Sequence, residues 1–203
     1  MPDIRGLFWD VGGVLLTNGW DRAARGRAVE AFGLDRDEFE TRHAEVDAPF
    51  ELGRLTLDEY LDRVVFYERR RFERQTFKEF MFGQSQAHPD TLAVVERLAA
   101  SRRYLLAALN NESLELNEYR IARFGLRRYF SVFFSSCFLG VKKPEAAIYR
   151  IALQLAQLHP EETVFIDDRP LNLECAAHCG MRTIHYQGSE GLAAGLRALG
   201  IDA

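Results

Sequence analysis

Short apolar runs of strand length recur along the chain, and most of them end at polar residues or glycine. The first run, residues 7–9, is followed by Asp10 and then by Gly12 and Gly13. A glycine pair would break a helix, so this run predicts a buried strand that ends at Asp10. Similar runs span residues 104–109, 132–134, 163–166 and 183–186.

Beyond residue 88, the segments between these runs carry apolar residues three and four positions apart, the period of an amphipathic helix. Helices are expected to carry Leu92, to follow Ser113, to begin at Pro144, and to carry Leu173 and Leu192. Proline suits a first helical position because its missing N–H has no partner there in any case. Strands that alternate with helices indicate βαβ units and therefore a parallel sheet.

Residues 18–86 carry helical signals and no convincing strand. Helix starts with the spacing of a capping box lie at Asp35, Thr56 and Thr76. The predicted fold is therefore an α/β protein with a Rossmann-like parallel sheet, built from residues 1–17 and 87–203. Residues 18–86 are expected to form a small α-helical cap, inserted after the first strand and standing over the carboxyl ends of the strands.

Polar groups follow four of the predicted strands. They are Asp10, Asn110 with Asn111, Lys142 with Lys143, and Asp167 with Asp168. Right-handed crossovers would bring all of these strand ends to one edge of the sheet. Carboxylates hold Mg²⁺, and a lysine with amide groups neutralises and orients phosphate oxygens, so the set predicts phosphoryl transfer. Each residue alone also has a structural interpretation, such as a helix cap or a surface lysine.

Composition narrows the classes of function. The formal net charge is −4 for 203 residues, which gives no support to a nucleic-acid-binding surface. No stretch approaches a membrane span, and the amino terminus lacks a signal-peptide pattern. We therefore expect a cytoplasmic protein that does not bind nucleic acid or membrane. The three cysteines, an odd and sparse number, argue against a disulfide framework. No residue pattern specifies an oligomeric state.

The motifs at these strand ends resemble those of the haloacid dehalogenase-like hydrolase superfamily. The matching segments are residues 8–14, 109–111, 143–149 and 164–172, in order along the whole chain. The sequence is most similar to the group that contains glucose-1-phosphate phosphatase and the amino-terminal phosphatase domain of soluble epoxide hydrolase. The resemblance implies a Mg²⁺-dependent phosphatase that acts on a small phosphomonoester.

The resemblance also implies residue roles. Asp10 would attack phosphorus and form an aspartyl-phosphate, while Lys143 would balance the charge of the nucleophile and the phosphate. Mg²⁺ would be held by Asp10, the backbone carbonyl of Gly12, Asp167 and Asp168, with Asp168 as the direct ligand and Asp167 direct or water-bridged. Asn110 and Asn111 would bind phosphate oxygens.

Two positions depart from the family pattern. Gly12 stands where a second aspartate usually protonates the leaving oxygen, and Asn110 stands where serine or threonine is usual. General acid catalysis typically contributes ~10²–10⁴-fold, so its absence favours esters with good leaving groups, such as anomeric sugar, acyl or aryl phosphates. Glu112, His43 or another cap residue would be the substitutes to consider.

The cap is expected to choose the substrate. Candidate residues are Asn18, Trp20, His43 and the residues around Phe50 and Leu52. Trp20 has two interpretations, stacking on a sugar ring or packing at the hinge. Two alternative functions stay open at this point: a catalytically silent phosphate- or metal-binding regulatory protein, and a 2-haloacid dehalogenase, which needs no metal.

Overall fold

A five-stranded parallel sheet forms the centre of the molecule. The computed structural model describes residues 3–202, and the strands follow the order β3-β2-β1-β4-β5. The strands are β1 (Gly6–Trp9), β2 (Leu105–Asn110), β3 (Val132–Ser135), β4 (Thr163–Asp167) and β5 (Arg182–His185). The first strand therefore lies between β2 and β4. This arrangement confirms the α/β fold class with a parallel sheet.

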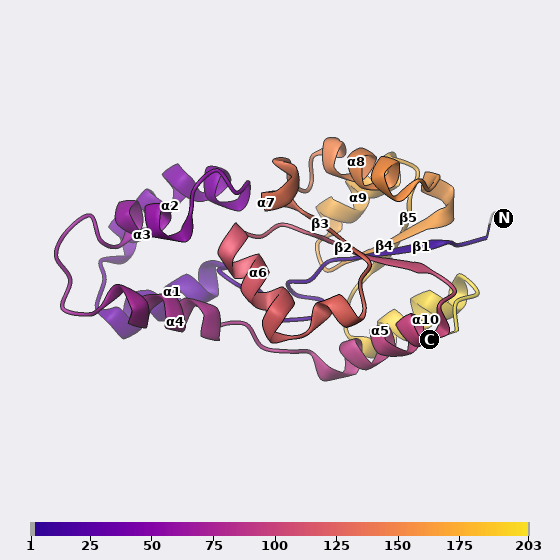
Figure 1. Cartoon of the computed structure of the whole chain (residues 1–203), viewed down its shortest axis with the longest axis horizontal. Coiled ribbons are helices and arrows are strands. Elements are labelled where there is room, and N and C mark those ends of the chain that lie inside the picture. Colours follow the sequence, from indigo (N-terminus) through magenta and orange to yellow (C-terminus); the bar gives the residue numbers. More distant parts are fainter. Residues whose placement is uncertain (1–2, 203) are drawn as a thin grey trace.

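Helices cover both faces of the sheet. The helices that follow the first inserted segment are α5 (Pro89–Ser101), α6 (Leu114–Arg123), α7 (Ser136–Leu139), α8 (Ala146–Ala156), α9 (Pro170–His178) and α10 (Ser189–Ala198), with 3₁₀ turns η1 (Leu126–Arg128) and η2 (Pro160–Glu162). Figure 1 shows α8 and α9 on one face and α5 and α10 on the other. Among residues 3–202, no helix combines the length and the apolarity needed to cross a bilayer.

The side chains of β1 alternate between these two layers, as a strand requires. Leu7 and Trp9 join the apolar cluster under α5 and α10, whereas Phe8 joins the cluster under α8 and α9. All three side chains are fully buried. A strand buried on both faces reads as a continuous apolar run, which is why residues 7–9 could be recognised as a core strand.

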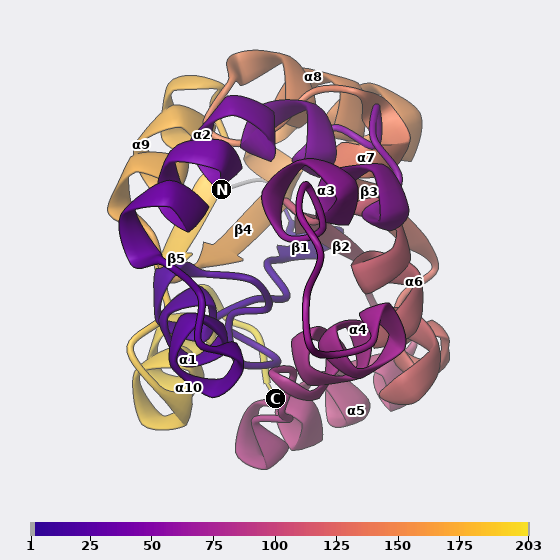
Figure 2. The same ribbon diagram turned by 90° about the vertical axis from the view of Figure 1, so that its left-hand side faces the viewer.

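The inserted segment is helical, and it packs into an apolar cluster of its own. Its helices are α1 (Arg22–Phe32), α2 (Arg36–Glu51), α3 (Leu57–Val64) and α4 (Arg74–Gly83). Figure 2 shows them standing in front of the sheet when the molecule is viewed from their side. Their cluster draws most of its buried residues from these helices and their connections, among them Phe39, Tyr60 and Phe77.

Most of the expected helix starts occur where the sequence placed them. Asp35 and Thr56 cap α2 and α3, and Thr56 forms a complete capping box with Glu59. Two predicted starts are wrong. Helix α4 begins at Arg74, ahead of Thr76, and α8 begins at Ala146 with Glu145 as its N-cap, so Pro144 lies in the preceding loop.

The polypeptide enters the helical segment at Thr17 and leaves it at Gln86, and hydrogen bonds join these two backbone segments. The backbone N–H of Thr17 donates to the carbonyl of Gln86 at 2.8 Å, and the N–H of Gln86 donates to the Thr17 hydroxyl at 2.9 Å. The Thr17 hydroxyl in turn donates to the carbonyl of Gln84. These hydrogen bonds hold the entering and the leaving backbone segments together at the base of the helical segment.

A second connection joins the end of α2 to α7 on the opposite side. Lys142 pairs with Glu51 at 2.8 Å, and the Ser136 hydroxyl donates to the Glu51 carbonyl at 2.7 Å. Beside them, Gly53 has a φ of +69°, and a Cβ atom there would lie 2.5 Å from the carbonyl oxygen of Cys137. Only glycine fits this approach without a shift of the backbone.

We predict that Gly53→Ala destabilises the protein more than Gly33→Ala, its matched control. Gly33 has a similar φ of +63°, but it has nothing within 4 Å of the added carbon. Gly33→Ala should therefore cost only the left-handed backbone strain of about 1–2 kcal/mol. Gly53→Ala adds the collision with Cys137 and should cost at least about 1 kcal/mol more. Urea unfolding of both variants measures this difference, and equal losses would show that the close approach has no weight in solution.

Candidate functional site

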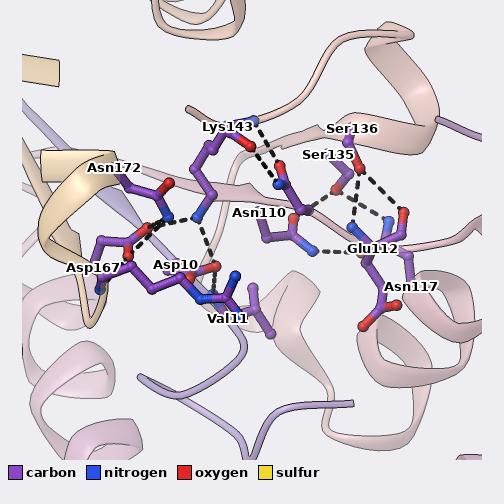
Figure 3. A network of polar contacts seen from close by, with 12 residues as sticks. Asp10, Val11, Asn110, Glu112, Asn117, Ser135, Ser136, Lys143, Asp167 and Asn172 are labelled. Atoms are coloured by element: carbon purple, nitrogen blue, oxygen red, sulfur yellow. Dashed lines mark hydrogen bonds and ion pairs between the residues drawn. The ribbon is translucent and has the colours of Figure 1, made fainter. Parts of the chain in front are cut away.

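The ends of β1 and β4 bring two carboxylates to one lysine. Asp10 follows β1 directly, and Asp167 is the last residue of β4. The Lys143 ammonium lies 2.9 Å from Asp10 Oδ1 and 2.7 Å from Asp167 Oδ2 (Figure 3). Because β1 and β4 are parallel neighbours, their carboxyl ends meet at the same edge of the sheet. The structure thus brings together the three charged residues that the sequence placed on separate segments.

These three side chains are almost completely withdrawn from solvent, and the pKa values of Asp10 and Lys143 reflect it. Burial raises the pKa of Asp10 to about 7; the Lys143 ammonium opposes this shift and the Asp167 carboxylate adds to it. Burial alone would lower the pKa of Lys143, but the two carboxylates raise it above its ordinary value. The carboxyl groups on either side therefore keep Lys143 as an ammonium ion.

A third carboxylate completes a group suited to a metal ion. Oxygens of Asp10, Asp167 and Asp168 all lie within 4.8 Å of one another. Asp168 Oδ1 is buried and has no hydrogen-bond partner in the described part of the chain. An unpartnered buried carboxylate oxygen is costly unless a cation approaches it. Oxygen donors of this kind fit Mg²⁺, which prefers hard ligands.

Asp168 reaches this position because the backbone opposite has no side chain. Gly13 has a φ of +77°, and a Cβ atom there would lie 2.3 Å from Asp168 Oδ2. Asp167, in contrast, is already engaged. Its oxygens accept hydrogen bonds from the Asn172 amide and from the backbone N–H of Arg169, in addition to Lys143. The partners of Asp167 fix its orientation, whereas Asp168 keeps a free oxygen.

The two asparagines at the end of β2 have different surroundings. Asn110 is buried; its amide donates to Asn117 Oδ1 at 3.1 Å, and its carbonyl accepts from the Ser135 hydroxyl at 2.8 Å. Asn111 forms a pair of hydrogen bonds with the backbone of Lys143, one to its carbonyl and one from its N–H, both at 2.9 Å. The structure therefore places the Asn110 side chain in an internal network, and it uses Asn111 to position the lysine.

A cavity of about 270 Å³ lies between this edge of the sheet and the helical segment. Its walls on the side of the sheet include Asp10, Gly12, Asn111, Glu112, Arg120, Lys143 and Asn172. Its walls on the side of the helical segment include Trp20, Arg22, Arg25, His43, Asp47, Phe50 and Glu51. The cavity joins the carboxylate–lysine group to a second, strongly polar wall, and such a space accommodates a small charged or hydroxylated molecule.

Trp20 lines the cavity but is held by packing. It is 9% exposed, its Nε1–H donates to the Tyr60 hydroxyl at 2.8 Å, and its ring makes edge contacts with Phe39 and Phe77. This environment agrees with the hinge-packing interpretation of Trp20. His43 and Phe50 also reach the cavity wall, as does Asn18, whereas Leu52 is not among its lining residues.

A buried ion pair in the cavity wall was only partly visible in the sequence. Glu112 accepts a hydrogen bond from Arg120 Nη1 at 2.7 Å, and the side chains are 9% and 3% exposed. Burial raises the pKa of Glu112, and the Arg120 guanidinium opposes the shift. Arg120 Nη1 also lies 3.7 Å from the place where a side chain of Gly12 would begin. Glu112 was a candidate substitute for the missing acid at position 12, but nothing in its own segment marks Arg120, which lies inside α6.

Comparison with known proteins places the chain among hydrolases. The sequence model of the haloacid dehalogenase-like hydrolase family matches residues 4–180. The chain is 30% identical over 172 residues to flavin mononucleotide hydrolase 1 of Arabidopsis thaliana, which covers 84% of this chain and 69% of that protein. It is 41% identical over 59 residues to bifunctional epoxide hydrolase 2 of Rattus norvegicus, or 29% of this chain and 11% of that protein.

Solved structures share the fold. A haloacid dehalogenase family enzyme of Bacteroides thetaiotaomicron superposes with a TM-score of 0.81 at 21% identity, covering 95% of this chain and 98% of that one. The same enzyme in complex with magnesium and inorganic phosphate gives a TM-score of 0.76 at 20% identity, over 91% and 94% of the two chains. At this level of identity the superposition supports the fold.

We predict that Lys143→Met lowers the free energy of unfolding by about 3–5 kcal/mol at pH 8, because it leaves two buried carboxylates without their cation. The pKa of Asp10, already about 7, would rise further. The folded state would then hold a proton that the unfolded state releases, so stability must fall as pH rises. The loss should therefore shrink as the pH is lowered toward 5.

Denaturant unfolding in chelator between pH 5 and pH 8 measures this effect. Lys142→Met is the matched control, since Lys142 pairs with Glu51 where the side chains are 26% and 30% exposed. That pair should contribute less than about 1 kcal/mol. A Lys143→Met variant with the stability of Lys142→Met at every pH would contradict the role of Lys143 as the cation of the site.

Proposed function

The chain belongs to the haloacid dehalogenase-like hydrolase family, and from this premise we propose that it hydrolyses a small phosphomonoester. The observation that carries the proposal is the buried Lys143 ammonium in contact with both Asp10 and Asp167, beside the unpartnered oxygen of Asp168. Such a group combines a nucleophile, a cation for phosphate oxygens and a set of metal ligands within one small space.

Asp10 is the proposed nucleophile. Within the described residues, the ammonium of Lys143 and the backbone N–H of Val11 both contact Oδ1 of Asp10, and no bond is made to Oδ2. The two contacts hold the carboxylate in one orientation and leave Oδ2 for attack on phosphorus. The bond between phosphorus and the leaving oxygen breaks, the leaving oxygen takes up a proton from solvent, and water later hydrolyses the aspartyl-phosphate.

The proposed metal is Mg²⁺, held by Asp10, Asp168, the backbone carbonyl of Gly12, and Asp167 directly or through water. When bound, Mg²⁺ would neutralise charge on the phosphate oxygens and on the carboxylates around it. Asp167 also keeps Lys143 in place through its 2.7 Å contact, and Asn172 keeps Asp167 in place. The Lys143 ammonium is therefore already in position beside the nucleophile.

The leaving group is proposed to be one that departs easily. Gly12 supplies no carboxyl group to protonate it, and that step contributes ~10²–10⁴-fold where it operates. Glu112 has both carboxylate oxygens engaged, one by Ser113 and one by Arg120. Anomeric sugar phosphates, acyl phosphates and aryl phosphates are therefore the preferred classes. Flavin mononucleotide belongs in the same comparison because the plant relative is named for its hydrolysis.

Substrate selection is assigned to the helical segment. We propose that residues 18–86 act as a cap on a core made of residues 1–17 and 87–203. The cap has its own apolar cluster, and the bonds between Thr17 and Gln86 join the two chain crossings at its base. It contributes one wall of the cavity that contains Asp10. The core would hold the phosphate, and the cap would hold the rest of the molecule.

We predict that the protein releases phosphate from p-nitrophenyl phosphate and from activated small phosphomonoesters only when Mg²⁺ is present. Asp10→Asn should lower kcat by at least about 10³-fold, because it removes the nucleophile while keeping the side-chain shape. A panel that also contains flavin mononucleotide and glucose 1-phosphate would be assayed for phosphate release with Mg²⁺ and with chelator. Asp3→Asn, at an exposed position, is the matched control and should keep full activity.

Two results would contradict this function. If no ester in the panel is hydrolysed while Mg²⁺ or phosphate still binds, the protein is a silent binder. If halide is released from a 2-haloacid without metal, and no phosphate is released from any ester, the protein is a dehalogenase. Halide and phosphate would be measured on the same preparation, with circular dichroism to confirm that each variant is folded.

A further inference from the structure

The cap wall of the cavity contains a chain of polar contacts that the phosphatase proposal does not use. The indole Nε1–H of Trp20 lies 2.8 Å from the Tyr60 hydroxyl, and that hydroxyl lies 3.0 Å from His43 Nδ1. His43 Nε2 lies 3.3 Å from Asp47 Oδ1. The chain runs from the apolar interior of the cap to a carboxylate on the cavity wall.

The donors and acceptors of this chain have only one consistent direction. An indole N–H can only donate, so the Tyr60 oxygen accepts from Trp20. The hydroxyl hydrogen of Tyr60 is then free to donate to His43 Nδ1, which makes Nδ1 the acceptor. In neutral imidazole the other nitrogen carries the hydrogen, so the protonated Nε2 is the atom that lies 3.3 Å from Asp47 Oδ1. The two hydrogen bonds thus orient the His43 ring, and its protonated nitrogen faces one oxygen of Asp47.

Burial and ring stacking hold the side chains of Tyr60 and His43 in place. Tyr60 is fully buried and His43 is 6% exposed, while the Phe50 ring stacks on Tyr60 with centroids 4.2 Å apart and planes inclined by 13°. Burial, with the Arg25 guanidinium nearby, lowers the pKa of His43 to about 4. His43 is therefore neutral near pH 7, and the tautomer that the chain requires persists there.

Asp47 differs from the other carboxylates of the cap wall. Glu51 pairs with Lys142, and Asp21 accepts the backbone N–H of Ala24 as the N-cap of α1. Asp47 contacts neutral His43, and within residues 3–202 no lysine or arginine forms an ion pair with it. Its side chain is 40% exposed, so a carboxylate oxygen remains available to a molecule in the cavity.

We propose that Asp47 accepts a hydrogen bond from a hydroxyl of the leaving group and so selects hydroxylated phosphomonoesters, such as anomeric sugar phosphates. The inference rests on the phosphatase function proposed above, which sets the phosphate at Asp10, on the opposite wall of the same cavity. Asp47 is the specificity residue, and Trp20, Tyr60 and His43 are positioning residues that act through it.

The experiment compares a hydroxylated ester with one that lacks hydroxyls in the leaving group. Glucose 1-phosphate and ribose 1-phosphate are the hydroxylated probes, and p-nitrophenyl phosphate is the reference. Asp47→Ala should lower kcat/KM for the best hydroxylated probe by about 10- to 100-fold, the range for a hydrogen bond to a charged group. kcat/KM for p-nitrophenyl phosphate should change by less than about twofold. Glu45→Ala, an exposed carboxylate on the same helix, should change neither value.

A second pair of variants separates positioning from folding. His43→Gln keeps an N–H near the place of Nε2 and should retain most of the preference for the hydroxylated probe. His43→Ala removes that donor and should lose the preference while hydrolysis of p-nitrophenyl phosphate persists. If Asp47→Ala is poorly folded by circular dichroism, Asp47→Asn replaces it, since it keeps the shape and removes the charge.

The outcomes distinguish the two proposals. A selective loss on the hydroxylated probe in Asp47→Ala supports the inference. An equal loss on all esters, or no loss on any, overturns the inference and leaves the phosphatase function in place. Wild-type protein that hydrolyses p-nitrophenyl phosphate but none of the hydroxylated probes overturns it as well. Wild-type protein that hydrolyses no ester overturns the phosphatase function, and the inference with it.

Discussion

The structure depends on one buried ammonium between two carboxylates. Lys143 contacts Asp10 at 2.9 Å and Asp167 at 2.7 Å, and none of the three is more than 7% exposed. Two carboxylates this close would repel each other at low dielectric, and one of them would take up a proton without the cation between them. The surrounding hydrogen bonds keep the cation there. The Asn111 side chain bonds to the Lys143 backbone, and the Asn172 amide donates to Asp167. The charged group therefore requires several elements to be folded correctly at once.

The sheet topology brings these elements into the correct positions. Strand β1 lies between β2 and β4, so the residue after β1 is flanked by the ends of both neighbours. Asp10 donates its backbone N–H to the carbonyl of Ile166, which extends the β1–β4 pairing up to the site itself. A one-residue slip in this register would turn the Asp10 side chain toward the opposite face of the sheet. Because apolar side chains of β1 are buried on both faces, the core contacts on each side oppose such a slip, and the site inherits its geometry from the core.

The sequence predicts the parallel sheet, most helix starts and the meeting of Asp10, Lys143 and Asp167, because all of these follow from local periodicity and from the rule that parallel strands end at one edge. Orientation of single side chains does not follow in this way. The Asn110 amide turns to Ser135 and Asn117, which come from β3 and α6, and no local pattern brings those elements together. Pro144 shows the same limit for backbone. Its fixed φ suits a helix start, yet the loop that delivers Lys143 continues through it, and α8 begins at Ala146.

The absence of a carboxylate at Gly12 is built into its surroundings. A side chain at position 12 would begin 3.2 Å from Asn18 Oδ1 and 3.7 Å from Arg120 Nη1. Arg120 is already neutralised by Glu112 at 2.7 Å, and its other terminal nitrogen donates to the Thr17 carbonyl. A carboxylate added at this point would compete with Glu112 for the same guanidinium, and Asn18 Oδ1 would repel it. The Arg120 guanidinium, which would have to neutralise an acid at position 12, is thus already paired with Glu112. A site built in this way requires a substrate whose leaving group departs without a proton donor at that position.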